Sequence, residues 1–262
     1  GSGLTAIGNQ ALDANTTGSN NTAVGSAALG ASTTAIESVA VGTFALDANT
    51  TGSYNTAVGY NALSANTTGT RNTSLGWGAN RMGTTGAHNT AIGDACMYQN
   101  DVTGSYNTGV GREALHYVIG SSNTAVGYQA LFANTTGASN TAIGQGALDS
   151  CTTGAENTSI GKASMEDVTT GNYNVALGVE ALREATSAEE NVAIGFQALE
   201  YATGSNNSAL GTKAGEDVTT GGNNFFIGRE TGVSGSPGGS ITTGNNEGVI
   251  GNQSVSKINM QV

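Results

Sequence analysis

The sequence predicts an all-β fold, a parallel β-solenoid with coils of about 17 residues. A Val, Ile or Leu followed by glycine recurs fifteen times, and ten of the fourteen intervals between these glycines have the same length. Asparagine stands four residues before the glycine in 12 of the 14 complete repeats. A short fixed period of this kind is the signature of stacked coils. The chain contains 41 glycines and is only 37% hydrophobic, which is too little for a globular core but enough for the thin core of a solenoid.

One repeat reads T-G-x-x-N-T-A-V-G-x-x-A-L followed by four variable residues, as in residues 51–67. The Thr-Gly pair and the glycine after the valine suit tight corners, because glycine adopts positive φ without steric cost. We expect two short strands per coil: the stretch 55–59, and the stretch that ends in Ala-Leu at 62–63. Helix is excluded, since no apolar period of 3.6 residues survives a corner every eight or nine residues.

The N-T-A-V-G strand has two faces, and neither is suited to water. Its aliphatic residue points to one face, and its central residue, which is small in 13 of 15 coils, points to the other. One face can fill the lumen of the coil, so the other needs a cover that this chain does not supply. Another copy of the chain is the natural candidate, and the pattern therefore predicts a homo-oligomer.

The conserved columns of the repeat, meaning the residues at one place in successive coils, are best interpreted as structural. Stacked asparagines can bond along the coils and satisfy backbone groups of the turns. Four Asn-Thr-Thr sequons match glycosylation acceptors, at Asn15, Asn49, Asn66 and Asn134, but they fall where the repeat needs turn residues. The predicted structural ladder consists of Asn21, Asn55, Asn72, Asn89, Asn140, Val24, Val58, Ile92, Ile143, Gly25, Gly59 and Gly93.

Stretches such as 55–59 (NTAVG) and 89–93 (NTAIG) resemble the repeats in the heads of trimeric autotransporter adhesins and in the shafts of bacteriophage tail fibres. The resemblance covers the chain from about residue 4 to residue 251. It implies a left-handed parallel β-roll assembled as a homotrimer around the apolar strand. The adhesin repeat is usually shorter, and we expect the extra residues here to enlarge the variable outer turn.

The C-terminal part favours one of these two classes. We expect a repeat domain over residues 1–251 with a loop insert at 233–245, and then a strand-like tail over 252–262 that leads out of the solenoid. Such an ending resembles the lead-in to the chaperone domain of a phage fibre, whereas an adhesin head passes into a heptad stalk. The sequence therefore predicts a structural segment of a phage tail fibre, part of the virion, that serves host attachment. The alternatives are the head of a trimeric adhesin on a bacterial cell surface and a glycan-cleaving tailspike.

Few residues suit catalysis, so we expect no enzyme, no cofactor and no metal site. His88 and His116 lie in different repeat positions without triad partners, and the two cysteines are too far apart to pair. The net charge of −11 argues against nucleic acid, and no segment is apolar enough to insert in a membrane. An acidic column, Asp149, Glu166, Glu200 and Glu216 interrupted by Arg183, is interpreted as a solvated face rather than a Ca²⁺ or glycosidase site.

Aromatic residues after the repeated glycine are the candidates for recognition. This position varies strongly, which indicates exposure to solvent. Rings there can stack on sugars or anchor a protein. Two interpretations of Tyr60, Trp77, Tyr128 and Phe196 stay open: they contact a host-surface glycan or protein receptor, or they only cover neighbouring turns.

Overall fold

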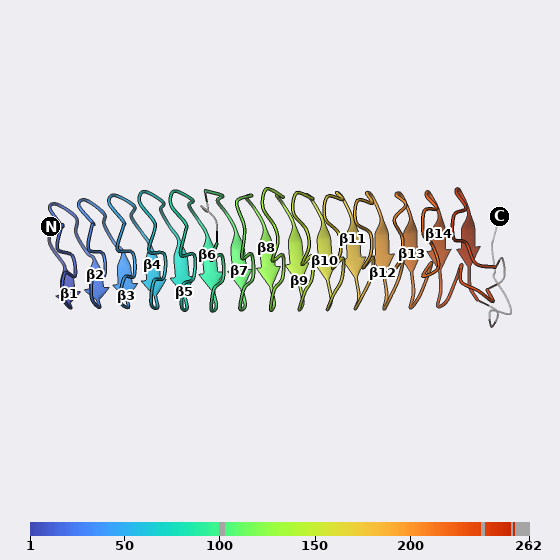
Figure 1. Ribbon diagram of the computed structural model, residues 1–262, viewed down its shortest axis with the longest axis horizontal. Coiled ribbons are helices and arrows are strands. Elements are labelled where there is room, and N and C mark those ends of the chain that lie inside the picture. Colours follow the sequence, from blue (N-terminus) through green and yellow to red (C-terminus); the bar gives the residue numbers. More distant parts are fainter. Residues whose placement is uncertain (100–102, 237–238, 253, 255–262) are drawn as a thin grey trace. The chain divides into compact units, whose positions relative to one another are not determined.

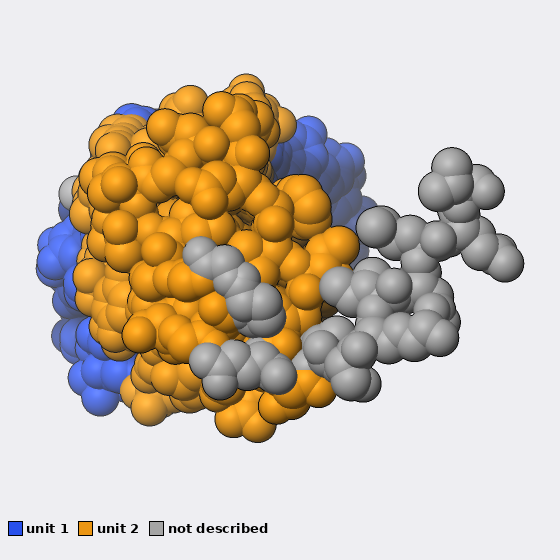
Figure 2. All heavy atoms as spheres, turned by 90° about the vertical axis from the view of Figure 1, so that its right-hand side faces the viewer, with its two compact units in different colours: residues 1–139 blue, residues 140–262 orange. Residues whose placement is uncertain are grey.

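The computed structural model describes residues 1–99, 103–236, 239–252 and 254. The chain is a parallel β-solenoid with about 17 residues per coil, as predicted, and the described residues contain no helix. It divides into two compact units, residues 1–139 (unit 1) and 140–262 (unit 2), which are coloured separately in Figure 2. Since the described part has no helix, it has none that is long and apolar enough to cross a membrane.

Each described coil contributes one strand of three residues (Figure 1). The strands of unit 1 are β1 (Thr5–Ile7), β2 (Thr22–Val24), β3 (Val39–Val41), β4 (Thr56–Val58), β5 (Thr73–Leu75), β6 (Thr90–Ile92), β7 (Thr108–Val110) and β8 (Thr124–Val126). Those of unit 2 are β9 (Thr141–Ile143), β10 (Thr158–Ile160), β11 (Val175–Leu177), β12 (Val192–Ile194), β13 (Ser208–Leu210), β14 (Phe225–Ile227) and β15 (Gly248–Ile250). Within each unit, consecutive strands pair in parallel and in register, so that equivalent residues stack in columns.

The glycine after each strand turns the chain into the next segment of the coil. Gly59, for example, has a φ of 139°, a value that L side chains rarely adopt. A Cβ atom built there would collide with the carbonyl oxygen of Gly76, the equivalent glycine one coil along. The repeated glycine is therefore required both by its backbone conformation and by the close approach of neighbouring coils.

The prediction of a second strand in each coil is wrong. After the glycine, alternate residues have positive φ: 54° at Asn61 and 51° at Leu63 in one coil. This alternation folds the segment into successive turns instead of an extended strand. The segment still bonds to its neighbours along the coils, as the Leu63 N–H donates to the Ala79 carbonyl at 2.9 Å. A leucine with positive φ costs about 1–2 kcal/mol, which the repeated inter-coil bonds and burial offset.

The core lies in the lumen of the coil and consists of columns of small residues and one column of large residues. The central strand residue, as at Ala57, and the Ala-Leu pair, as at Ala62 and Leu63, are completely buried. The same arrangement recurs in the preceding coils of unit 1, where these residues form one continuous hydrophobic cluster from Leu12 to Leu63. The strand alanine, and not the aliphatic residue, therefore faces the interior.

Two departures from this pattern compensate each other in unit 2. Phe226 stands where most other coils have alanine, and its ring is fully buried. Gly215 and Gly232 occupy the place of the large residue in two neighbouring coils. A Cβ atom at Gly215 would lie 2.8 Å from Cδ2 of Phe226, and one at Gly232 would collide with the same ring. The phenylalanine thus fills the space that leucines fill elsewhere.

The predicted insert and tail lie at the C-terminal part of unit 2. Residues 233–236 and 239–245 form turns without strand, held in part by a bond from the Ile241 N–H to the Gly232 carbonyl at 3.0 Å. Of the predicted tail 252–262, only Asn252 and Ser254 belong to the described residues. The rest of that tail prediction falls outside the described part of the chain.

Candidate functional site

The outward face of the strands carries an aliphatic column in both units. Its members flank the buried central residue and are half-buried or exposed, up to 61% at Ile7. Val24, Val58 and Ile92 are half-buried, and Ile143 is exposed. A second outward column, mostly threonine, runs beside it. Among the described residues, no element covers this face, which we call the strand face.

The asparagine column forms a hydrogen-bonded ladder beside the strands. Asn72 is buried; its Oδ1 accepts the N–H of Asn89 at 2.9 Å, and its Nδ2 donates to the Gly86 carbonyl at 2.8 Å. Asn21, Asn55, Asn89 and Asn140 make the same pair of contacts with their own neighbours. These contacts satisfy backbone groups that the corner of the coil would otherwise leave unpaired. The column is structural in its chemistry.

A row of aromatic rings follows successive coils of unit 1. Neighbouring rings lie 5.0–6.5 Å apart between centroids; four of the five pairs are nearly parallel, and the fifth is edge-on. Distances in this range are those of favourable aromatic pairs. We call this row the aromatic ladder; its members are Phe44, Tyr60, Trp77, Tyr98, His116 and Phe132.

Polar contacts hold the middle of the aromatic ladder in place. The Nη1 of Arg81 donates to the hydroxyl of Tyr98 at 2.8 Å, and its guanidinium lies over the same ring. The Nδ1 of His116 lies 3.2 Å from the Ala95 carbonyl oxygen. Partial burial lowers the pKa of His116 and so favours the neutral imidazole. The Ala95 carbonyl and the charge of Glu113 offset part of this lowering. A neutral ring stacks between Tyr98 and Phe132 without charge to solvate.

The structure brings together only some of the residues predicted to contact a receptor. Tyr60 and Trp77 are exposed members of the aromatic ladder. Tyr128 is exposed but packs under the guanidinium of Arg112 instead, with 5.6 Å between the guanidinium carbon and the ring centroid. Phe196 is exposed in unit 2, and the described residues place no other ring against it.

Sequence reasoning missed the other members of the ladder. Phe44 lies two residues after its coil's glycine, and Tyr98, His116 and Phe132 lie five residues after theirs. Residues in different columns meet because the ladder crosses from one column to another between neighbouring coils. Gly78 permits the crossing, since a Cβ atom there would lie 2.6 Å from Cε2 of Tyr98. This glycine, at a position that usually carries a side chain, is the sequence feature that could have indicated the crossing.

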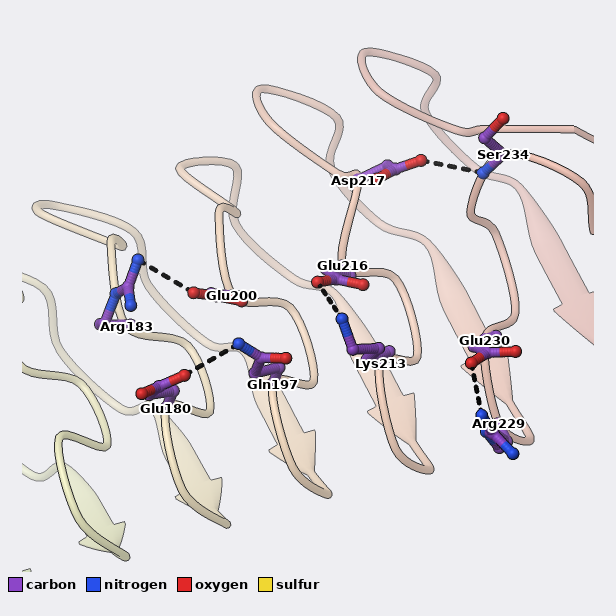
Figure 3. Close-up of polar contacts among 10 residues, drawn as sticks. All are labelled: Glu180, Arg183, Gln197, Glu200, Lys213, Glu216, Asp217, Arg229, Glu230 and Ser234. Atoms are coloured by element: carbon purple, nitrogen blue, oxygen red, sulfur yellow. Dashed lines mark hydrogen bonds and ion pairs between the residues drawn. The ribbon is translucent and has the colours of Figure 1, made fainter.

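Two members of the acidic column of unit 2, Glu200 and Glu216, form ion pairs with cationic side chains (Figure 3). Arg183 Nη2 lies 2.9 Å from a carboxylate oxygen of Glu200, whose side chain is only 1% exposed. Burial raises the pKa of Glu200, and the charge of Arg183 opposes that rise. Lys213 and Glu216 pair at 2.8 Å, and Gln197 donates to Glu180 at 2.8 Å. The interpretation of this column as a solvated face is therefore wrong for Glu200.

Asp149, the first acidic member of that column, has an unusual environment. Desolvation, together with the negative charges of Glu166 and Asp167, raises its pKa to about 6. Its Oδ1 is buried and has no hydrogen-bond partner. Within the described part of the chain, no group of three or more His, Cys, Asp or Glu side chains is arranged to hold a metal ion.

The remaining candidates from the sequence are structural. His88 stacks on Tyr106 with 4.9 Å between ring centroids, away from His116. Cys96 and Cys151 are buried and not joined in a disulfide; burial raises the pKa of Cys96 to about 12. The sequon asparagines Asn49, Asn66 and Asn134 are fully buried, so the folded coil does not present them for glycosylation.

Comparison with known proteins adds no family to these observations. No protein-family model matches the chain, and no curated protein matches its sequence.

Proposed function

We propose that this chain is a structural segment of a phage tail fibre: a left-handed β-roll, assembled as a homotrimer, that serves attachment to the host surface. The observation that carries the proposal is the strand face. In every described coil it bears an aliphatic residue, while the lumen behind it is already filled, mostly by alanine and leucine. An apolar stripe that recurs coil after coil needs a cover. A second and third copy of the same stripe match its length and spacing coil for coil.

The interior of the coil supports a mechanical role. Buried asparagines, backbone bonds between coils and a small-residue lumen repeat in each unit, so each coil is supported by its neighbours. The side chains that vary between coils lie outside these contacts. A segment of this kind is suited to a stiff spacer whose surface can change, and it belongs on a virion or, in the alternative of an adhesin head, on a bacterial cell surface.

Native mass spectrometry tests the assembly. We expect a mass three times that of the 25.9 kDa chain. Val58→Glu combined with Ile92→Glu places charges on the strand face of unit 1 and is expected to give monomers that keep their β-sheet circular dichroism. Met82→Glu, at an exposed apolar residue outside the strands, is the matched control and should stay trimeric. A folded wild-type monomer refutes the trimer.

Cell binding separates the fibre from the adhesin. Fluorescently labelled protein is incubated with a range of bacteria and, in parallel, with animal cells and extracellular-matrix proteins. Saturable binding to bacteria supports the tail fibre, and binding restricted to animal cells or matrix supports the adhesin head.

A glycan-cleaving tailspike is the second candidate, because Asp149 has the raised pKa that a general acid needs and lies near Glu166. Incubation of the protein with bacterial surface polysaccharides tests it. If the wild-type protein shortens the polysaccharides and Asp149→Asn does not, the tailspike is favoured. Polysaccharides left intact by the wild type would exclude cleavage of those substrates.

A further inference from the structure

We infer that the aromatic ladder of unit 1 binds a carbohydrate chain of low net charge, laid along successive coils. The inference rests on the proposed function for its biological meaning, since it supplies the chemical class of the attachment receptor. The members of the ladder lie outside the strands, so glycan binding and trimer formation are tested by separate measurements.

The aromatic ladder is continuous. Its ring contacts pass from Phe44 through Tyr60 and Trp77 to Tyr98, and on to His116 and Phe132, without a gap. The members come from six successive coils. A linear polymer of sugar rings can contact the aromatic rings of such a row one after another, whereas a compact ligand would contact only one or two of them.

The rings at one end of the ladder are open to solvent. Phe44, Tyr60 and Trp77 are 39%, 46% and 49% exposed, which is large for aromatic side chains of a folded protein. The near-parallel rings of Tyr60 and Trp77 have centroids 6.5 Å apart, which is farther than in the other near-parallel pairs of the ladder. The face of an aromatic ring is negative, and the C–H bonds on one side of a pyranose ring pack against it.

The middle of the ladder is rigid before any ligand arrives. Tyr98 is fixed by the hydrogen bond and the overlying guanidinium of Arg81, and by the space that Gly78 leaves for its ring. His116 is fixed by its contact with the Ala95 carbonyl. Side chains that are already ordered lose little conformational entropy when a ligand binds.

The charges beside the ladder select the class of ligand. Asp94 and Arg112 occupy the column of Tyr60 and Trp77 in the next two coils, and both are exposed. Arg112 pairs with Asp94 only at 3.7 Å and with Glu113 at 2.8 Å, so the Asp94 carboxylate remains available to the hydroxyl groups of a sugar. A guanidinium already paired with two carboxylates offers little to a polyanion, and binding of nucleic acid would need a basic stripe. A glycan of low net charge fits both the rings and the charges.

Trp77 is the chain's single tryptophan, so its fluorescence reports on this site alone. The trimeric protein is titrated with dextran, mannan, purified O-polysaccharides and capsular polysaccharides, and with oligo(dT) as a polyanion. We expect a saturable change in Trp77 fluorescence with at least one polysaccharide and none with oligo(dT). Tyr60→Ala and Tyr98→Ala should each weaken that binding about tenfold, which corresponds to ~1.4 kcal/mol.

Phe196→Ala is the matched control, because Phe196 is similarly exposed in the same column as Tyr60 but outside the ladder; its binding should equal that of the wild type. No response to any polysaccharide, equal binding by the ladder variants, or a response to oligo(dT) alone overturns the inference. Native masses of the same samples keep the two proposals apart: a trimer without glycan binding refutes only this inference, and a monomer that binds glycan refutes only the proposed assembly.

Discussion

Phe226 and the two glycines around it make the packing of the lumen testable. Phe226→Ala restores the small residue that other coils have at this place but leaves a cavity, because Gly215 and Gly232 supply no side chain to fill it. Gly215→Leu with Gly232→Leu restores the usual large column but overpacks it against the phenylalanine. All three changes together recreate the Ala-and-Leu packing of the other coils.

The expected sizes follow from what each variant does to the core. Truncating a fully buried phenylalanine costs about 3–5 kcal/mol. The double leucine variant is expected to lose about 1–3 kcal/mol or more, since a Cβ atom at Gly215 already lies 2.8 Å from the Phe226 ring and 2.9 Å from Leu199. Leucine is compatible with the backbone there, because Gly215 has a φ of 65° and Leu199 one of 51°. The triple variant should therefore return to within about 1–2 kcal/mol of the wild type.

Urea unfolding at one fixed protein concentration measures the free energies, because the stability of an oligomer depends on concentration. Hydrogen exchange over residues 209–232 localises the change to the affected coils. We expect a favourable coupling of at least about 2 kcal/mol between the phenylalanine change and the leucine changes. Additive losses, with the triple variant the least stable of all, would refute the compensation.

Three further predictions concern the corner glycines, the asparagine ladder and the acidic column. Gly59→Ala should destabilise unit 1 by about 3 kcal/mol or more, because its φ is positive and the new Cβ atom collides with Gly76. Gly146→Gln, at a positive-φ glycine with free space around it, should be neutral or stabilising by less than about 1 kcal/mol. Equal losses of the two variants in thermal unfolding would count against the backbone explanation. Asn72→Ala leaves the Asn89 N–H and the Gly86 carbonyl without their partner and should cost about 2–4 kcal/mol in urea unfolding. Asn72→Ser should cost less, because Ser38 in the same column accepts the Asn55 N–H at 3.2 Å, and a serine variant as unstable as the alanine one would contradict this. The folded state raises the pKa of Asp149 to about 6, whereas the unfolded state has the ordinary value near 4. The folded state therefore binds this proton more tightly, and the residue's contribution to stability falls as pH rises from about 4 to about 6. Asp149→Asn should therefore raise stability at pH 7 by about 1 kcal/mol, discounted for partial exposure to solvent, and flatten stability across that window; an unchanged pH profile would refute it.

The period of the sequence was enough to predict the coil, its parallel strands and the lack of helix in the described residues. The repeated glycine, asparagine and alanine columns are visible because the same environment recurs in every coil. The second strand could not be predicted correctly, since the turns after Gly59 rely on positive φ at Asn61 and Leu63. Leucine has no intrinsic preference for that conformation, and only packing in the lumen and bonds between coils impose it.

The aromatic ladder could not be predicted from the sequence for a different reason. Its rings occupy three places in the repeat, so no single column is aromatic. Phe44 and Tyr60 come from different places in the repeat, and so do Trp77 and Tyr98. Their contacts depend on how side chains lean between neighbouring coils, which a column-by-column comparison does not capture. The same limit applies to Glu200, whose burial beneath Arg183 is not visible from the order of charges.

The two units together show that the aromatic ladder is not needed to build the coil. Tyr98, His116 and Phe132 stand five residues after the glycine in unit 1, and unit 2 has Glu166, Arg183 and Glu200 at the same place. Both units nevertheless form the same three-residue strands, the same glycine corners and the same asparagine ladder. Rings that served only to cover neighbouring turns would be expected wherever those turns occur. Their restriction to consecutive coils of unit 1 favours a role in recognition, carried by positions that the fold leaves free to vary.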